Sequence, residues 1–241
     1  MDTQRVHSLR RRAMADAKKL LTTTSFGRRL LLPRYRYQYS PEQLWSLCET
    51  AEAALLLGGA FAEIGVYDGT TTVYLHRHLQ SKGPAPTYYC IDTFSGFTEE
   101  DIEVEMERGN AVDYANLFYF NNKETFERTM KLSGLDRTIA IQADAATFDY
   151  TSLQPLSFAL IDVDLLRPVR AALNGCWEKL LPGGVLVIDD CDVSVKHFDG
   201  AYEAFVEFCE LHDLPVDIRF DKLGFATRPV AFDHDPPVAP S

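Results

Sequence analysis

The feature that most constrains the fold is the regular alternation of short apolar runs with segments of helical periodicity after residue 40. Runs of this length, bounded by polar or turn residues, are typical of strands that are buried on both faces. Strands that alternate with helices predict a parallel sheet with helices on both sides. The five predicted parallel strands are Ala60–Val66, Tyr88–Asp92, Thr138–Gln142, Phe158–Asp162 and Val185–Asp189.

The rest of the pattern predicts the helices and the end of the sheet. After the last helix, residues 216–220 and 225–227 favour two strands around Lys222-Leu223-Gly224, which indicates an antiparallel hairpin. Pro182-Gly183-Gly184 is expected to turn the chain into the fifth strand. The predicted helices span 41–57, 69–80, 121–133, 168–181 and 200–212.

These patterns together predict an α/β fold. We expect a doubly wound, mostly parallel seven-stranded sheet with a C-terminal antiparallel hairpin and an N-terminal helical extension. The expected division is an arm and helical cap at 1–57, a main domain at 58–230 with a lid insertion at 94–120, and a loose Pro-rich tail at 231–241.

Composition excludes several other classes. With 46% hydrophobic residues among 241, the chain can bury the core of one domain. No uncharged apolar stretch approaches the length of a membrane span, so no membrane partner is expected. The five cysteines are widely spaced and contain no CxxC pair, which favours a reducing, cytoplasmic compartment.

The net charge of −11 is unevenly distributed. Residues 1–36 contain ten Lys and Arg against two Asp, whereas the remainder is strongly acidic. An acidic body argues against nucleic acid as the main partner. The basic arm is expected to cap the acidic body or to cover the substrate, and a solvated tail or a targeting segment are the alternatives.

Acidic residues recur where the predicted parallel strands end. They are Glu63 within the first strand, Asp92, Asp144, Asp162, and the pair Asp189 and Asp190. A single such residue is more often a turn or helix cap. Because ligands of doubly wound sheets bind at the carboxyl ends of the strands, the set as a whole predicts a functional site.

The turn after the first strand has the spacing Glu63-x-Gly65-x-x-x-Gly69. It differs from the G-x-G-x-x-G pattern of dinucleotide-binding proteins, which disfavours the rival hypothesis of a dehydrogenase. The glycines let the backbone approach a ligand, and the following helix offers unpaired N–H groups. Asp92, at the end of the next strand, can accept the ribose hydroxyls of a nucleoside.

With these residues the chain resembles the class I S-adenosylmethionine-dependent methyltransferases, over about residues 58–229. The resemblance implies S-adenosylmethionine as cofactor. The positions that match the family's cofactor site, together with their neighbours, are Glu63, Gly65, Gly69, Thr70, Asp92, Ser95 and Asp144.

The second half of the chain resembles one branch of that class, the macrocin O-methyltransferase family. The resemblance rests on Asp92-Thr-Phe-Ser-Gly-Phe, on Phe158-Ala-Leu-Ile-Asp-Val-Asp164 and on Val187-Ile-Asp-Asp190. Members methylate hydroxyl groups, often on sugars of natural products, and need a divalent metal. The family's metal site matches Asp162, Asp189 and Asp190, whose hard oxygen ligands suit Mg²⁺ or another divalent cation.

The chain departs from the family pattern D-G-D-x-Y-E, because it has Asp162-Val-Asp-Leu-Leu-Arg167. The missing side chains line the substrate in relatives, so the acceptor stays open between a glycoside and a catechol-like phenol. Asp162 and His197 are the candidate catalytic bases. A homodimer or higher homo-oligomer is expected. A non-catalytic binding protein that kept the fold is the alternative of a different class.

Overall fold

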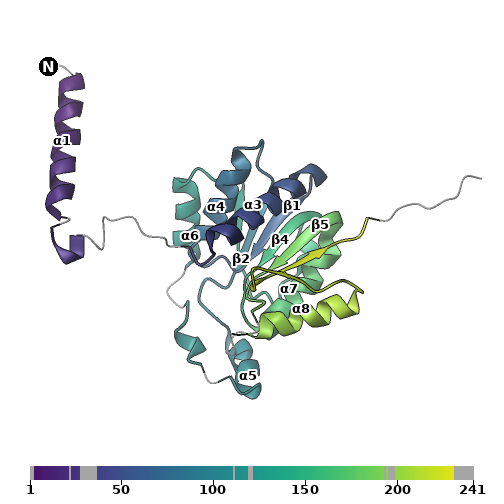
Figure 1. Cartoon of the computed structure of the whole chain (residues 1–241). Helices are drawn as coiled ribbons and strands as arrows, with labels where there is room; N and C mark the ends of the chain where they lie inside the picture. The colour runs from purple at the N-terminus through teal and green to yellow at the C-terminus, as the bar shows by residue number, and fades with distance from the viewer. Residues whose placement is uncertain are drawn as a thin grey trace, which may run out of the picture. The chain divides into compact units, whose positions relative to one another are not determined.

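The computed structural model describes residues 3–21, 23–27, 37–110, 112–118, 122–192, 194 and 199–230 (Figure 1). The chain divides into two compact units, with the boundary between Gln38 and Tyr39. The first unit contains helix α1 (Thr3–Leu21), which has Lys18 and Lys19 in its last turn. The second unit contains the sheet and all the remaining elements described below.

The second unit is built on one seven-stranded sheet with the order β3-β2-β1-β4-β5-β7-β6. Strands β1 to β5 are parallel, and β7 and β6 are antiparallel additions at the β5 edge. The expected doubly wound fold with its C-terminal hairpin is therefore confirmed. The strands are β1 (Ala60–Ile64), β2 (Tyr88–Asp92), β3 (Thr138–Gln142), β4 (Leu156–Ile161), β5 (Leu180–Ile188), β6 (Asp217–Arg219) and β7 (Leu223–Thr227).

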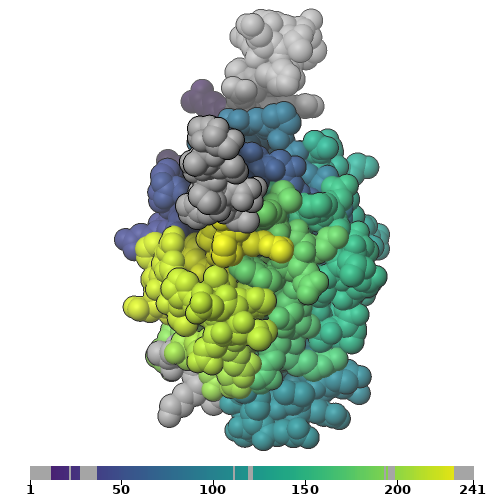
Figure 2. All heavy atoms as spheres, turned by 90° about the vertical axis from the view of Figure 1, so that its right-hand side faces the viewer, coloured from purple at the N-terminus to yellow at the C-terminus, as the bar shows by residue number. Residues whose placement is uncertain are grey.

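Helices cover both faces of this sheet. Helix α3 packs on β4 and β5 and contacts α4, whereas α7 packs on the same strands from the opposite side and contacts α8, which also contacts β7 (Figure 1). The space-filling view shows the surface of α8 and the C-terminal hairpin in yellow-green and yellow (Figure 2). The helices are α3 (Pro41–Ala54), α4 (Thr70–Gln80), α5 (Glu99–Glu107), α6 (Lys123–Leu132), α7 (Leu166–Lys179) and α8 (Gly200–Leu211), with short 3₁₀ turns at Leu55–Leu57, Tyr114–Asn116 and Tyr150–Ser152.

Local sequence explains why α3 begins where it does. Ser40 accepts a hydrogen bond from the backbone N–H of Gln43, and the Gln43 side chain accepts one from the Ser40 N–H. This reciprocal capping box, with Pro41 at the first helical position, satisfies donors that would otherwise be unpaired. The helix then buries Leu44, Leu47 and other small apolar residues against the sheet.

The fifth strand begins earlier than predicted. Strand β5 starts at Leu180, directly after α7, and its bounds therefore include Pro182-Gly183-Gly184. The backbone N–H of Gly183 donates to the carbonyl of Arg228, and the β4–β5 register shifts in this region. A wide bulge with positive φ at Gly183 lies between the pair Leu156–Leu180 and the pair Phe158–Val185, so the chain does turn at this motif before the continuous ladder begins at Val185, as predicted.

The segment predicted as a lid insertion contains α5 and packs firmly at its helical part. Arg108 at the end of α5 forms ion pairs with Asp199 and Glu203 at the start of α8. The buried carboxylate of Glu105 accepts a hydrogen bond from the backbone N–H of Leu166 in α7. Helix α5 is thus bonded to α7 and α8, and these two helices also pack extensively against each other.

Within the described residues, none of the helices combines the length and the apolar character that a transmembrane segment requires.

Candidate active site at the carboxyl ends of the strands

The winding of the sheet reverses between β1 and β4, because β2 and β3 lie beyond β1 on one side and β5 lies beyond β4 on the other. Crevices at such a switch point are the usual ligand sites of open α/β sheets. Here the turn after β1 directly contacts the end of β4: a Cβ added at Gly65 would overlap the carbonyl oxygen of Asp162. Gly65 also has a φ of 85°, so glycine is required there on two counts.

Asp92 ties the end of β2 to the turn after β1. Its Oδ2 accepts hydrogen bonds from the backbone N–H groups of Val66 at 2.8 Å and Tyr67 at 3.0 Å. Its Oδ1 accepts one from the N–H of Phe94 at 2.7 Å. The predicted cofactor acid and the predicted glycine turn are therefore brought together, as expected for one binding site.

Gly69, Thr70 and Ser95 lie around the same turns. Gly69 is the N-cap of α4 with a φ of 80°, and a Cβ there would press on Met130 and Phe126 of α6. The N–H of Thr70 donates to the side chain of Asp68 at 2.9 Å. Ser95 is exposed just after β2, in a loop in which its N–H donates to the hydroxyl of Thr93 at 3.3 Å.

Asp144 follows β3 and is held from two sides. Its Oδ1 accepts a hydrogen bond from the N–H of Ala146 at 2.8 Å. Arg167 of α7 lies 3.6 Å from its Oδ2 and forms a shorter ion pair, 2.6 Å, with the buried Asp101 of α5. Arg167 therefore connects the predicted cofactor loop to the segment predicted as a lid, a link that the sequence did not reveal.

Glu63 lies apart from these residues. It is buried in β1, 1% exposed, on the sheet face covered by α3 and α4, where its Oε2 accepts a hydrogen bond from the hydroxyl of Tyr88 at 2.9 Å. Burial raises the pKa of this carboxyl to about 8, because the charged form loses its hydration. Its carboxyl group is thus enclosed in the core behind the turn.

An aromatic cluster joins the turn after β1 to the segment predicted as a lid. The Tyr67 ring packs edge-on against Phe118 at 5.1 Å, and Phe97 contacts both Phe118 and Tyr114 at 5.5 and 5.9 Å. Tyr67 and Phe118 both have positive φ, which is costly for aromatic residues and is concentrated at functional sites. These side chains form one wall beside the glycine turn.

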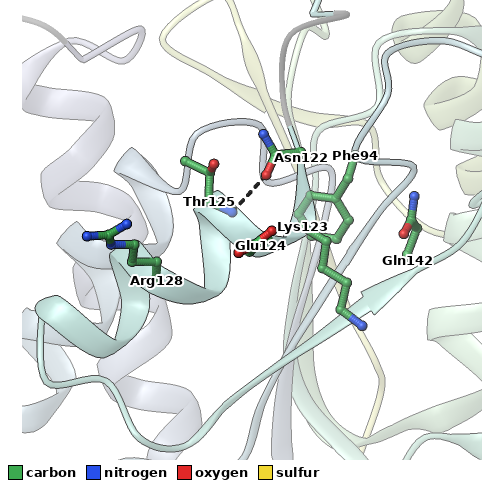
Figure 3. Close-up of a pocket in the computed structure, with 7 residues that line it drawn as sticks. All are labelled: Phe94, Asn122, Lys123, Glu124, Thr125, Arg128 and Gln142. Atoms are coloured by element: carbon green, nitrogen blue, oxygen red, sulfur yellow. Dashed lines mark hydrogen bonds between the residues drawn. The ribbon is translucent and has the colours of Figure 1, made fainter.

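A shallow pocket of about 570 Å³ opens beside the ends of β2 and β3 (Figure 3). The close-up shows Phe94 between Lys123 of α6 and Gln142 of β3, with the Thr125 N–H donating to Asn122. None of the predicted cofactor residues lines it, so it adjoins the predicted site rather than coinciding with it. Its lining residues are Phe94, Asn122, Lys123, Glu124, Thr125, Arg128 and Gln142.

The second group of predicted acids gathers at the ends of β4 and β5. Carboxylate oxygens of Asp162, Asp164 and Asp190 lie within 4.8 Å of one another, close enough to share one cation. Asp162 and Asp190 were predicted metal ligands, whereas Asp164 was not among them. Asp164 and Asp190 both have a φ near +55°, at 58° and 55°, and this strained backbone turns their side chains to the same place.

Asp189, the third predicted metal ligand, is directed differently. Its Oδ2 accepts a hydrogen bond from the ammonium group of Lys222 at 2.7 Å, and Lys222 also bonds to Asp190. The other oxygen of Asp189 is buried without a hydrogen-bond partner among the described residues. A buried carboxylate oxygen without a donor, beside three other aspartates, is the kind of group that a divalent cation satisfies.

Two residues that bond to this acid cluster (Asp162, Asp164, Asp189 and Asp190) were missed by sequence reasoning. One is Lys222, and the other is Tyr39, which is almost fully buried and donates a hydrogen bond from its hydroxyl to Asp162 at 2.9 Å. The Lys222 ammonium group also lies 5.3 Å from the centre of the Tyr39 ring. Neither residue belongs to a motif, so only the three-dimensional contact identifies them.

Burial and mutual repulsion raise the pKa of Asp162, in that order of importance, and the same causes raise that of Asp164. Burial and the charge of Asp190 also raise the pKa of Asp189, to about 6, against the lowering effect of Lys222. Perturbed carboxyl groups in a crevice are typical of functional sites. His197, the alternative base, lies outside the described residues.

The comparisons with known proteins concern the family and the fold. A family model described as a methyltransferase domain matches residues 62–191, more than half of the chain. None of the curated proteins compared with the chain matches its sequence.

Solved structures show the same fold at low sequence identity. The O-methyltransferase NovP is 17% identical, with a TM-score of 0.64 over 82% of this chain and 84% of its own. The calicheamicin methyltransferase CalS11 is 18% identical, with a TM-score of 0.63 over 94% and 93%. TomG, an O-methyltransferase from Streptomyces achromogenes involved in tomaymycin synthesis and solved with S-adenosylmethionine, is 16% identical, with a TM-score of 0.52 over 87% and 89%. From the matched domain and this fold, the chain belongs to the methyltransferase domain family, whose methyl donor is S-adenosylmethionine.

Proposed function

We propose that this chain is a metal-dependent O-methyltransferase that moves a methyl group from S-adenosylmethionine to a hydroxyl group, most simply a sugar hydroxyl, of a small natural product. The observation that carries the proposal is the contact between two sites at one crevice. The glycine turn at Gly65 touches the backbone of Asp162, which belongs to the acid cluster. A methyl donor on the turn and an acceptor at the cluster would therefore be neighbours.

The donor site is proposed to include Gly65, Gly69 and Thr70 on the first turn, with Asp92 accepting the ribose hydroxyls. Asp92 already has backbone donors on both of its oxygens, which fix its orientation while lone pairs remain for a ligand. Ser95 and Asp144 would contact the rest of the nucleoside. Glu63 would support the turn from within the core through its bond to Tyr88.

Methyl transfer would proceed as an in-line displacement. The acceptor oxygen attacks the sulfonium methyl carbon, the new C–O bond forms, and the C–S bond breaks with its electron pair going to sulfur. The hydroxyl proton passes to the carboxylate of Asp162. The protein's contribution is alignment of oxygen, carbon and sulfur in a crevice that excludes water.

The proposed metal would be held by Asp162, Asp164 and Asp190, with Asp189 behind them. A divalent cation bound there would lower the pKa of an acceptor hydroxyl group. The oxygen-only donor set supports a hard cation such as Mg²⁺.

The acceptor class rests on the resemblance to the macrocin O-methyltransferase family. It is supported by a protein of similar structure, CalS11, which is a calicheamicin methyltransferase and a TDP-rhamnose 3'-O-methyltransferase. The aromatic wall around Tyr67 and Phe97 is suited to packing against a sugar or an aromatic ring. A small-molecule acceptor, glycoside or phenol, fits this site better than nucleic acid, because the site is acidic.

The organisation of the rest of the chain is proposed on the same basis. The arm and helical cap at 1–57 would cover the acceptor and contribute to a homodimer or higher oligomer through the part before Tyr39, because α3 packs on the sheet, and the segment at 94–120 would cover the site. The body at 58–230 would carry the chemistry. A cytoplasmic location is proposed because all five cysteines are free and buried.

The decisive experiment is a methyl-transfer assay with labelled S-adenosylmethionine against a panel of glycosides and phenols, with and without EDTA. Activity on a hydroxyl that EDTA abolishes and Mg²⁺ restores is expected. Asp162→Asn should abolish turnover and leave donor affinity unchanged by titration calorimetry. Asp217→Asn, which removes an exposed partner of Arg219, is the matched control and should keep full activity.

Two outcomes would contradict the proposal at different levels. Full activity in EDTA would contradict the proposed metal dependence and indicate a metal-free methyltransferase. Methylation predominantly at nitrogen would contradict the proposal that the acceptor is a hydroxyl group.

A further inference from the structure

The β6–β7 hairpin positions Lys222 beside the acid cluster. Phe220 and Asp221 both have left-handed backbone conformations, with φ of 56° and 52°, and the Lys222 N–H donates to the Arg219 carbonyl at 3.2 Å. These features make a tight turn between β6 and β7, with three residues between the paired Arg219 and Leu223. It places Lys222 where its ammonium group meets Asp189. The hairpin therefore does more than close the sheet.

The backbone around the two aspartates is fixed independently of that ammonium group. The N–H of Asp189 donates to the carbonyl of Ile161 at 2.8 Å, and the N–H of Cys191 donates to the carbonyl of Lys222 at 2.7 Å. Both are main-chain hydrogen bonds that a change of the Lys222 side chain would leave intact. The Lys222 side chain thus supplies charge to the cluster rather than its shape.

The ammonium group of Lys222 shares a carboxylate with the candidate cation site. Asp190 belongs to the set whose oxygens lie within 4.8 Å of one another, and it also bonds to Lys222. Lys222 is 22% exposed and Asp189 only 2%, so water screens their interaction weakly. Two positive charges held on the same carboxylate repel each other strongly in such surroundings.

From this geometry we propose that Lys222 is the built-in counter-ion of the acid cluster and that it opposes the binding of a divalent cation there. The inference rests on the metal site of the proposed function. Without a metal, Lys222 offsets the repulsion among the four aspartates. With a metal, it weakens the affinity and keeps the ion exchangeable. Loss of the charge would leave the backbone that carries the aspartates in place.

The test is a titration of the full-length protein with Mn²⁺, in the absence of S-adenosylmethionine and of any methyl acceptor. The EPR signal of free Mn²⁺ measures how much of the ion is bound. Lys222→Met should bind Mn²⁺ about tenfold more tightly than the wild type or better, since a unit charge at contact distance has at least this effect. Lys222→Arg keeps the charge and should bind as the wild type does. Lys82→Met, which removes a lysine from a surface ion pair with Glu52, is the matched control and should show no change.

The outcomes separate this inference from the function on which it rests. Equal or weaker Mn²⁺ binding by Lys222→Met, with measurable binding by the wild type, overturns only the role of Lys222. Binding by neither protein at millimolar Mn²⁺ overturns the inference and the metal site together. If Lys222→Met does not fold by circular dichroism, Lys222→Gln, which is uncharged but polar, replaces it with the same expectation.

Discussion

The hydroxyl of Tyr39 donates a hydrogen bond to Oδ2 of Asp162 at 2.9 Å, across 123 residues of sequence. Tyr39 is the first residue of the compact unit that holds the sheet, directly after the unit that contains α1. Asp162 belongs to the cluster that is proposed to bind the metal and take the proton. The first residue of this unit is therefore hydrogen-bonded directly to a proposed catalytic residue.

Replacement of Tyr39 by Phe should impair turnover while the fold is retained. The ring keeps its packing, but Asp162 loses a donor that orients its carboxylate, so we expect kcat to fall about tenfold. The dissociation constant of S-adenosylmethionine should not change, because Tyr39 contacts the acid cluster. Steady-state kinetics and calorimetry measure the two quantities, and a variant with wild-type kcat would show that the bond has no part in catalysis.

Replacement of Arg167 by Met should destabilise the protein by about 2 kcal/mol, because the nearly buried Asp101 loses its partner. The KM for S-adenosylmethionine should also rise, since Arg167 faces Asp144 as well.

The matched control is Arg170, three residues further along the same helix, which pairs with Glu203 and Glu207 at the exposed surface. Its change to Met should cost less than about 1 kcal/mol. Urea unfolding measures the free energy of unfolding of both variants. Equal losses in the Arg167 and Arg170 variants would show that the Arg167–Asp101 ion pair contributes no more than a surface pair.

Glu63 makes a testable contribution to the dependence of stability on pH. Its folded-state pKa of about 8 exceeds the ordinary value of 4.5, so between these values the folded state holds a proton that the unfolded state releases. The contribution of Glu63 to the free energy of unfolding is fully present below the unfolded-state pKa and is lost as the pH rises through the folded-state pKa. The loss is at most about 1.4 kcal/mol per pH unit. Glu63→Gln should remove this loss.

The measurement is urea unfolding of both proteins at several pH values from about 5 to about 8, chosen to bracket the titration. The free energy of unfolding of Glu63→Gln should rise relative to the wild type as the pH increases. Shifts in the acid cluster occur in both proteins and cancel in the difference. Glu210→Gln, an exposed residue of α8, should track the wild type. A difference that does not vary with pH would rule out a protonated Glu63.

Deletion of residues 1–38 should leave the sheet-bearing unit folded, because the boundary between the two units lies after Gln38. The variant keeps Tyr39 and the capping box of α3. We expect near-normal donor binding, greatly weakened acceptor turnover and a changed sedimentation coefficient. Unchanged turnover and sedimentation would show that the arm serves neither as a cap nor as a subunit contact.

The sequence by itself determined the order of the strands along the chain and which of their ends carry acids. Buried strands produce a local signal, an apolar run of about five residues, that needs no knowledge of distant parts. The register of the carboxyl ends then follows from the parallel winding, which is why Asp92 and the glycine turn meet as predicted. Boundaries were less accurate, and Pro182-Gly183-Gly184 lies inside β5 because pairing with Arg228 accommodates the bulge.

Only the tertiary structure decided which side chains share the acid cluster. Asp164 enters it through a positive φ, and Lys222 enters it from a hairpin 33 residues beyond Asp189. Tyr39 comes from the opposite end of the chain. The direction of a side chain at a strand end depends on one or two backbone angles and on partners far away in sequence. Neither is encoded in a local pattern, so the predicted ligand set included Asp189, whereas in the structure Asp164 groups with Asp162 and Asp190.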